Sequence, residues 1–175
     1  MPKIVAIDLA TKAKTDHAPA TVQMNPAILG FGGRADIVDE VKVVRFDDVR
    51  DAHWELYLQV KGGQSLKIDL VEIGYRVLNG ATPRVGSDTT VTTITMSTPT
   101  TLEDAFKALG KIAGDLGDWS GTDAYNCQDF AVRMLRDMGC SAPSIMPFEL
   151  RRFVTKHRAP MIVSGRKGEP AVVTY

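Results

Sequence analysis

The segment Tyr125–Val132, which reads YNCQDFAV, places a cysteine at the point where an irregular stretch gives way to a helical pattern. Before it, glycines and polar residues over positions 114–123 keep no regular period. Gly139 later provides a helix stop. Between them, apolar residues recur at steps of three and four, the pattern of a half-buried helix: Phe130, Ala131, Met134, Leu135 and Met138. The sequence therefore predicts a helix that begins near Cys127.

Cys127 is the candidate nucleophile of this chain. A thiol in the first turn of a helix lies beside unpaired N–H groups and the positive end of the helix dipole, and both favour the thiolate. The alternative is a packing role, because free cysteine behaves as a small buried hydrophobe. Cys140 follows the helix stop, more than three turns away, which is roughly 20 Å at about 1.5 Å per residue. The two cysteines are therefore expected to be free thiols.

The composition predicts a single globular domain over residues 1–175. Hydrophobic residues make up 44% of the chain and charged residues 24%, which argues against a disordered or fibrous class. The 21 basic residues balance the 21 acidic ones without forming a basic block, so nucleic acid is not an expected partner. The sequence has neither a bilayer-spanning apolar run nor a signal-peptide pattern, which predicts a soluble, cytoplasmic protein. No cofactor is expected, and no metal site, because potential ligands lack close spacing.

Two alternating segments predict a β-hairpin. In residues 53–60 apolar side chains alternate with polar ones, and His53 opens this strand on the face away from the core. Glycines mark a turn within residues 61–64, and residues 65–71 form the return strand, with Asp69 on its polar face. A histidine and a carboxylate on neighbouring strands can face each other when the strand register permits it.

Other patterns predict the remaining elements. Thr101 lies three residues before Asp104, as at a capped helix start, and predicts a second helix. A third helix is expected over residues 144–157. Residues 10–34 are broken by prolines and glycines and are expected to form a loop excursion, and residues 74–83 a connection. Apolar and β-branched runs predict further strands at residues 3–9, 41–46, 91–96 and 171–175.

A sulfur nucleophile needs a base, a group that orients the base, and donors for the developing oxyanion. His53 is the expected base and later the acid, and Asp69 is the carboxylate that would fix its tautomer. Glu72 is the fallback for the orienting role. His157 is a competing base, although the basic segment around it offers no orienting carboxylate. Taken singly, His53 and Asp69 could each be surface residues without a catalytic role.

The donors for the oxyanion are expected at the start of the helix that carries the cysteine. The backbone N–H of Cys127 is the first of them, because N–H groups at a helix start lack intrahelical partners. A side chain could add a second donor, and the sequence leaves open whether this is Asn126, Gln128 or Tyr125.

Two short motifs resemble the paired signatures of the circularly permuted papain-like thiol enzymes. They are His53–Leu58 (HWELYL) and, about seventy residues later, Asn126–Phe130 (NCQDF). This group contains the lecithin:retinol acyltransferase-like proteins, the permuted branch of the NlpC/P60 superfamily and the PPPDE peptidases. In these proteins a histidine opens a strand and the cysteine follows at a helix start, the reverse of the order in papain-type chains.

The resemblance implies an α+β fold, in which a small antiparallel sheet packs against about three helices, with a core over about residues 40–140. It implies His53 as the base and Cys127 as the nucleophile. Trp54 and Trp119 are the candidates for contacts with a substrate.

Two departures from the acyltransferase-like members bear on the activity. Those members carry a second histidine on the return strand, where this chain has Ser65 and Lys67, and often a C-terminal membrane anchor, which is not expected here. Both departures favour a peptidase, isopeptidase or amidase that forms a thioester acyl-enzyme with a polypeptide or amide substrate. A lipid acyltransferase or phospholipase, and an inactive structural or interaction protein that keeps the fold, stay open. The oligomeric state also stays open.

Overall fold

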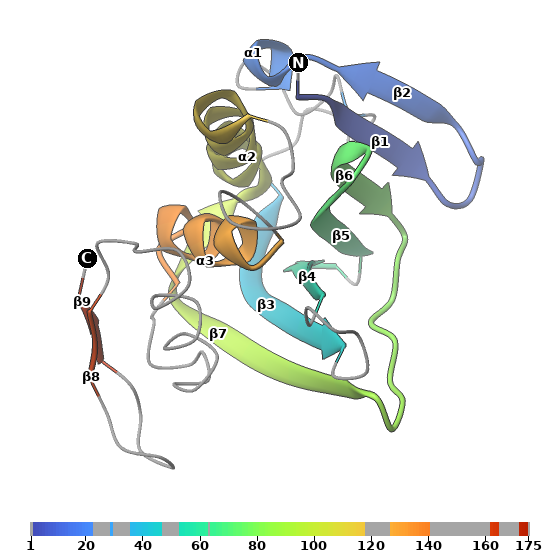
Figure 1. The fold of residues 1–175 in the computed structure, drawn as a ribbon. Coiled ribbons are helices and arrows are strands. Elements are labelled where there is room, and N and C mark those ends of the chain that lie inside the picture. Colours follow the sequence, from blue (N-terminus) through green and yellow to red (C-terminus); the bar gives the residue numbers. More distant parts are fainter. Residues whose placement is uncertain are drawn as a thin grey trace.

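A computed structural model describes residues 2–22, 29, 36–46, 53–62, 64–117, 127–140, 162–164 and 172–174. The described chain is α+β: α2 (Leu102–Leu116) and α3 (Cys127–Asp137) lie together on one side of a twisted sheet (Figure 1). The predicted fold class is thus correct at the level of α+β, but the sheet is large rather than small, because seven strands join it.

The strand order across this sheet is β2-β1-β6-β5-β4-β3-β7. Every neighbouring pair is antiparallel except β1 and β6, which run parallel. A separate antiparallel pair forms from β8 (Ile162–Ser164) and β9 (Val172–Thr174), of which only the second was predicted. The seven strands are β1 (Ile4–Asp8), β2 (Lys14–His17), β3 (Ile37–Phe46), β4 (Trp54–Val60), β5 (Gln64–Val71), β6 (Gly74–Asn79) and β7 (Thr89–Thr101).

The predicted hairpin is confirmed as β4 and β5, which turn through Lys61 and Gly62. Its register pairs Leu56 with Ile68. The strand β6 corrects the prediction of a connection over residues 74–83. Gly74 suggested a loop, but it occupies only the first position, with a φ of 124° that suits the tight β5–β6 turn.

The helices follow their local signals. The Thr101 hydroxyl accepts a hydrogen bond of 3.1 Å from the backbone N–H of Asp104, so the predicted cap of α2 is confirmed. The helix α3 begins at Cys127, and Gly139 after its end adopts a φ of 79°. The excursion predicted for residues 10–34 is wrong in part, because β2 and α1 (Pro19–Val22) form within it. The helix predicted over 144–157 lies outside the described residues.

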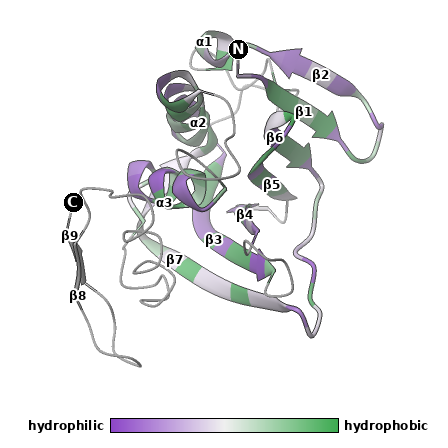
Figure 2. Ribbon diagram, viewed as in Figure 1, coloured by the Kyte–Doolittle hydropathy of each residue, from purple (hydrophilic) through white to green (hydrophobic). Residues whose placement is uncertain are grey.

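Both faces of the central strands are covered. The helix side carries the main core, in which the rings of Tyr75 on β6 and Phe130 on α3 meet edge to face at 5.3 Å. On the opposite side a smaller cluster contains Val44, Tyr57 and Ala81. The expectation that β4 buries one face only is therefore wrong: Glu55 and Tyr57, on its polar face, are also buried. Along the edge strand β7, hydrophobic residues alternate with less hydrophobic ones (Figure 2).

None of the described helices has the length and apolar character that a bilayer crossing requires.

Candidate functional site

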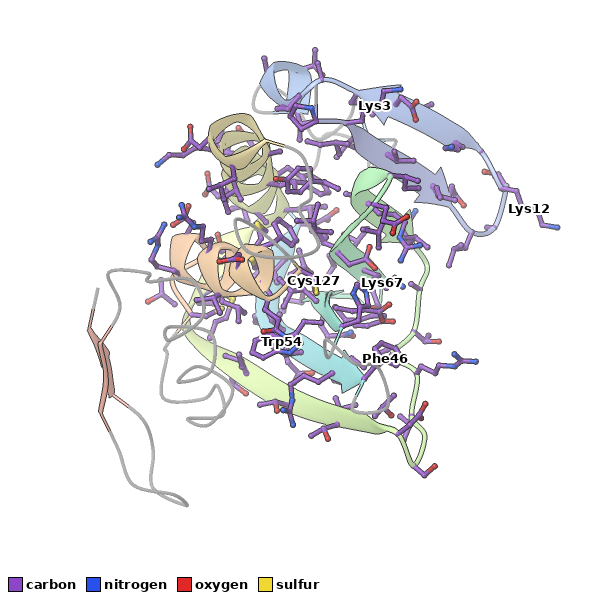
Figure 3. The ribbon with its side chains drawn as sticks, viewed as in Figure 1. Lys3, Lys12, Phe46, Trp54, Lys67 and Cys127 are labelled. Carbon is purple, nitrogen blue, oxygen red and sulfur yellow. The ribbon has the colours of Figure 1, made fainter. Side chains whose placement is uncertain are left out.

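The first turn of α3 packs against the β4–β5 hairpin and brings Cys127 to the strands. Figure 3 labels Cys127 at the start of α3, above the sheet. His53 directly precedes β4, and its pKa is raised from 6.5 to about 9. Burial alone would lower this pKa, but side-chain hydrogen bonds with Asp69 and with Cys127, and electrostatic interactions with both groups, outweigh it. The imidazole is thus close to both the thiol and the carboxylate.

The ring nitrogens of His53 have different surroundings. Its Nε2 lies 3.3 Å from Oδ2 of Asp69 and 3.7 Å from Oε1 of Glu55. This leaves Nδ1 as the nitrogen available to the Cys127 thiol. A carboxylate on one nitrogen and the nucleophile on the other is the arrangement in which the carboxylate selects the tautomer and the imidazole takes the proton.

The side chain of Asp69 is completely buried in the polar face of β5. Arg76, its cross-strand neighbour on β6, donates from Nε to Oδ1 at 2.9 Å and from Nη2 to Oδ2. Burial alone would raise the pKa of Asp69, but hydrogen bonds from His53 and Arg76 and the charge of Lys67 hold it below its usual value. The carboxylate beside His53 is therefore ionised and fixed in orientation.

A second carboxylate, Glu55, approaches the same histidine. Lys67 on β5 donates to its Oε1 at 2.6 Å, and the hydroxyl of Tyr57 donates to its Oε2 at 2.8 Å. Burial and this hydrogen bond raise the pKa of Tyr57. No role was predicted for Glu55, Lys67 or Arg76. The alternating pattern of β4 and β5 could have indicated Glu55 and Lys67, because it puts both residues on the same face of the sheet as His53 and Asp69.

The ligand atoms of His53, Glu55 and Asp69 all lie within 4.8 Å of one another, so strand pairing creates a cluster that could hold a metal ion. The expectation of no metal site rested on spacing along the chain, and spacing in the fold is different. The oxygens of both carboxylates are already engaged: Asp69 with Arg76, and Glu55 with Lys67 and Tyr57. An arriving cation would have to displace these donors, so the cluster suits a hydrogen-bonded imidazole better.

The other predicted site residues have four different outcomes. Gln128 is buried in the first turn of α3, next to Cys127. Trp54 is 1% exposed and belongs to the core, so its side chain has no surface to offer a substrate, and that prediction is corrected. Glu72 is exposed in the turn between β5 and β6, outside the charged cluster. The remaining candidates lie outside the described residues: Trp119, Tyr125, Asn126 and His157.

Cys140 lies beyond the far end of α3, and it is a free thiol like Cys127. Burial raises the pKa of Cys140 to about 11, and no interaction among the described residues offsets that effect. A thiol in this environment remains protonated at neutral pH.

No family model, no curated protein and no solved structure matches this chain. The resemblance to the permuted papain-like thiol enzymes therefore stays a prediction, and the functional argument depends on the side-chain geometry of the site.

Proposed function

We propose that the protein is a cysteine-nucleophile hydrolase that cleaves amide or isopeptide bonds through a thioester on Cys127. The observation that carries this proposal is the contact of His53 with the buried, Arg76-bound carboxylate of Asp69, together with the interaction with Cys127 that helps to raise the pKa of His53. A nucleophile, a base and an orienting group in series are the elements that acyl transfer requires.

In the first half of the proposed reaction, His53 already holds the thiol proton at neutral pH, and the sulfur of Cys127 attacks the substrate carbonyl carbon. The carbonyl oxygen gains negative charge, which the backbone N–H groups at the start of α3 would stabilise. Protonated His53 then gives its proton to the leaving amine, the C–N bond breaks and the thioester remains. In the second half, His53 removes a proton from water, the resulting hydroxide attacks the thioester, and the thiol leaves with that proton.

The charges around the site are compatible with this proton transfer. Before it, the cations Lys67 and Arg76 balance the anions Glu55 and Asp69. After it, the imidazolium of His53 balances the new thiolate of Cys127. Burial opposes the formation of this ion pair, and the interactions of His53 with Asp69 and Cys127 outweigh that opposition.

The direct test is selective alkylation. With limiting iodoacetamide at pH 7 under reducing conditions, mass spectrometry should show Cys127 modified well ahead of Cys140, because His53 interacts with Cys127 whereas burial raises the pKa of Cys140. His53→Gln should remove most of this difference. Equal reactivity of the two thiols in the folded protein would overturn the proposal. The alkylation-sensitive activity is then sought with fluorogenic peptide and isopeptide amides beside a fluorogenic phospholipid, and turnover of the phospholipid alone would reassign the substrate to a lipid ester.

A further inference from the structure

Two carboxylates lie near the ring of His53 and could accept its hydrogen bond. Its Nε2 is 3.3 Å from Oδ2 of Asp69 and 3.7 Å from Oε1 of Glu55. Each ring nitrogen carries at most one proton, so Nε2 can donate one strong hydrogen bond only, whether or not Nδ1 is also protonated. The direction of this bond sets the plane of the ring and hence the position of the atom that faces Cys127.

Lys67, in contrast to His53, lies nearer to Glu55 than to Asp69. Its Nζ lies 2.6 Å from Oε1 of Glu55 and 3.7 Å from Oδ2 of Asp69. It therefore engages the same Glu55 oxygen that approaches the histidine ring. The Tyr57 hydroxyl donates to the other oxygen of Glu55, so both oxygens of this carboxylate are held. The Lys67 side chain is 13% exposed and that of Glu55 7%, so solvent weakens this ion pair little.

The strand register explains why these cations are required. Leu56 pairs with Ile68 in the antiparallel register, so Glu55 and Asp69 lie opposite each other on adjacent strands. Two carboxylates in these positions repel each other. Each has its own cation: Lys67 is nearer to Glu55, and Arg76 binds Asp69 through two nitrogens. His53 is thereby left with Asp69 as its closer acceptor.

We propose that Lys67 is a positioning residue that retains the Glu55 carboxylate and thereby assigns His53 to Asp69. Glu55 is the competing acceptor that this residue restrains. The inference rests on the proposed function for its consequence in catalysis, but the choice of acceptor is a property of the charged cluster itself and can be measured without turnover.

The test compares Lys67→Met, Glu55→Gln and the double variant. Lys67→Met frees Glu55 to take the ring from Asp69, so amide turnover and Cys127 alkylation should each fall about 10- to 100-fold through misalignment. The pKa of His53, followed by NMR with His53→Gln for assignment, should rise because an unbalanced carboxylate then faces the imidazole. In the double variant the competitor is gone, and both the rates and the pKa should return to within about threefold and a few tenths of a unit of the wild-type values.

Lys67→Arg is the matched control, because it keeps the cation and should retain the wild-type pKa of His53. The inference is overturned if Glu55→Gln fails to reverse the Lys67→Met effects on the pKa and on alkylation while circular dichroism shows both variants folded. If no amide is cleaved by any variant but the pKa of His53 rises and returns as expected, the proposed hydrolase activity fails and the positioning role stands.

Discussion

The two cysteines at the two ends of α3 differ in surroundings far more than in burial. Cys127 is 7% exposed and Cys140 9% exposed, so burial does not separate them. Cys127 interacts with the raised-pKa imidazole of His53, whereas Cys140 experiences only desolvation, which raises its pKa to about 11. We therefore expect the proposed reactivity of Cys127 to depend on the charged groups of the sheet, because burial alone does not distinguish the two thiols.

The same physical effect has opposite outcomes at the two ends. Burial disfavours the charged form of both Cys140 and His53. At Cys140 no partner within the described part of the chain offsets this penalty. At His53 the partners on β5 and α3 exceed it, because Asp69 is held ionised by Arg76 and Lys67. The β4–β5–β6 strands therefore create the difference between the two thiols.

The largest expected effect is the loss of amide turnover when the proposed nucleophile is replaced. Cys127→Ser should lower amide turnover by about 10,000-fold or more, because a hydroxyl at this position is a far weaker nucleophile than a thiolate. Cys140→Ser should leave turnover within about twofold of the wild type. The measurement is the hydrolysis rate of the best fluorogenic amide at pH 7. Equal losses in the two variants would mean that the thiols share one role and that the contrast between the helix ends is irrelevant to function.

Asp69→Asn should give the next largest effect, with turnover reduced by about 100- to 10,000-fold, because the amide no longer fixes the histidine tautomer. The pKa of His53 should fall below about 9, since Asp69 contributes to raising it. The free energy of unfolding should drop by about 3 kcal/mol, because Arg76 loses its buried partner. Urea denaturation and NMR titration measure these two changes. A His53 pKa that stays near 9 would show that Cys127 alone supports it.

Much of this site follows from sequence patterns, and the parts that do not follow have a common cause. Alternation along residues 53–60 and 65–71 puts His53 and Asp69 on one face, and the helical period after position 127 predicts the cysteine at a helix start. Neither pattern reveals that Ala81 and Tyr57 cover the second face of the sheet, which is why Glu55 is buried and not solvated.

The charge partners depend on strand pairing. Arg76 binds Asp69 because β6 lies beside β5 with these two residues in register. Residues 74–83 were predicted to form a connection, which gave Arg76 no position in the sheet. Similarly, the parallel β1–β6 pair joins residues some seventy positions apart, and no local pattern specifies such a pairing. Local periodicity indicates which face a side chain occupies, whereas its partner depends on register.

The free energy of unfolding should fall over two separate pH ranges, one caused by His53 and a higher one caused by Cys140. The folded-state pKa of His53, about 9, exceeds its ordinary 6.5, so its stabilisation is complete below pH 6.5 and is lost as the pH rises toward 9. The pKa of Cys140, about 11 against an ordinary 9.0, gives a loss between pH 9 and 11. Each loss should amount to about 1–2 kcal/mol after solvent screening.

Urea denaturation across pH 6 to 11 measures the fall over both pH ranges. His53→Gln should flatten the slope between pH 6.5 and 9, and Cys140→Ala the slope between pH 9 and 11. If His53→Gln leaves the fall over the lower pH range unchanged, the imidazole is not held protonated by its partners, and the contrast with Cys140 loses its electrostatic basis.

The smallest expected effect tests whether the two ends of α3 act independently. Gly139→Ala places a side chain at a φ of 79°, where an added Cβ meets no neighbouring atom within 4 Å, so backbone strain is its only cost. The free energy of unfolding should fall by about 1 kcal/mol, and the hydrogen bond from the N–H of Cys140 to Leu135 should persist. The alkylation rate of Cys127 should not change. Gly62→Ala, at a φ of 112° in the open β4–β5 turn, is the matched control for backbone strain. A loss of Cys127 reactivity in Gly139→Ala alone would show that the helix transmits strain to the nucleophile, because the sheet partners of Cys127 are untouched by that substitution.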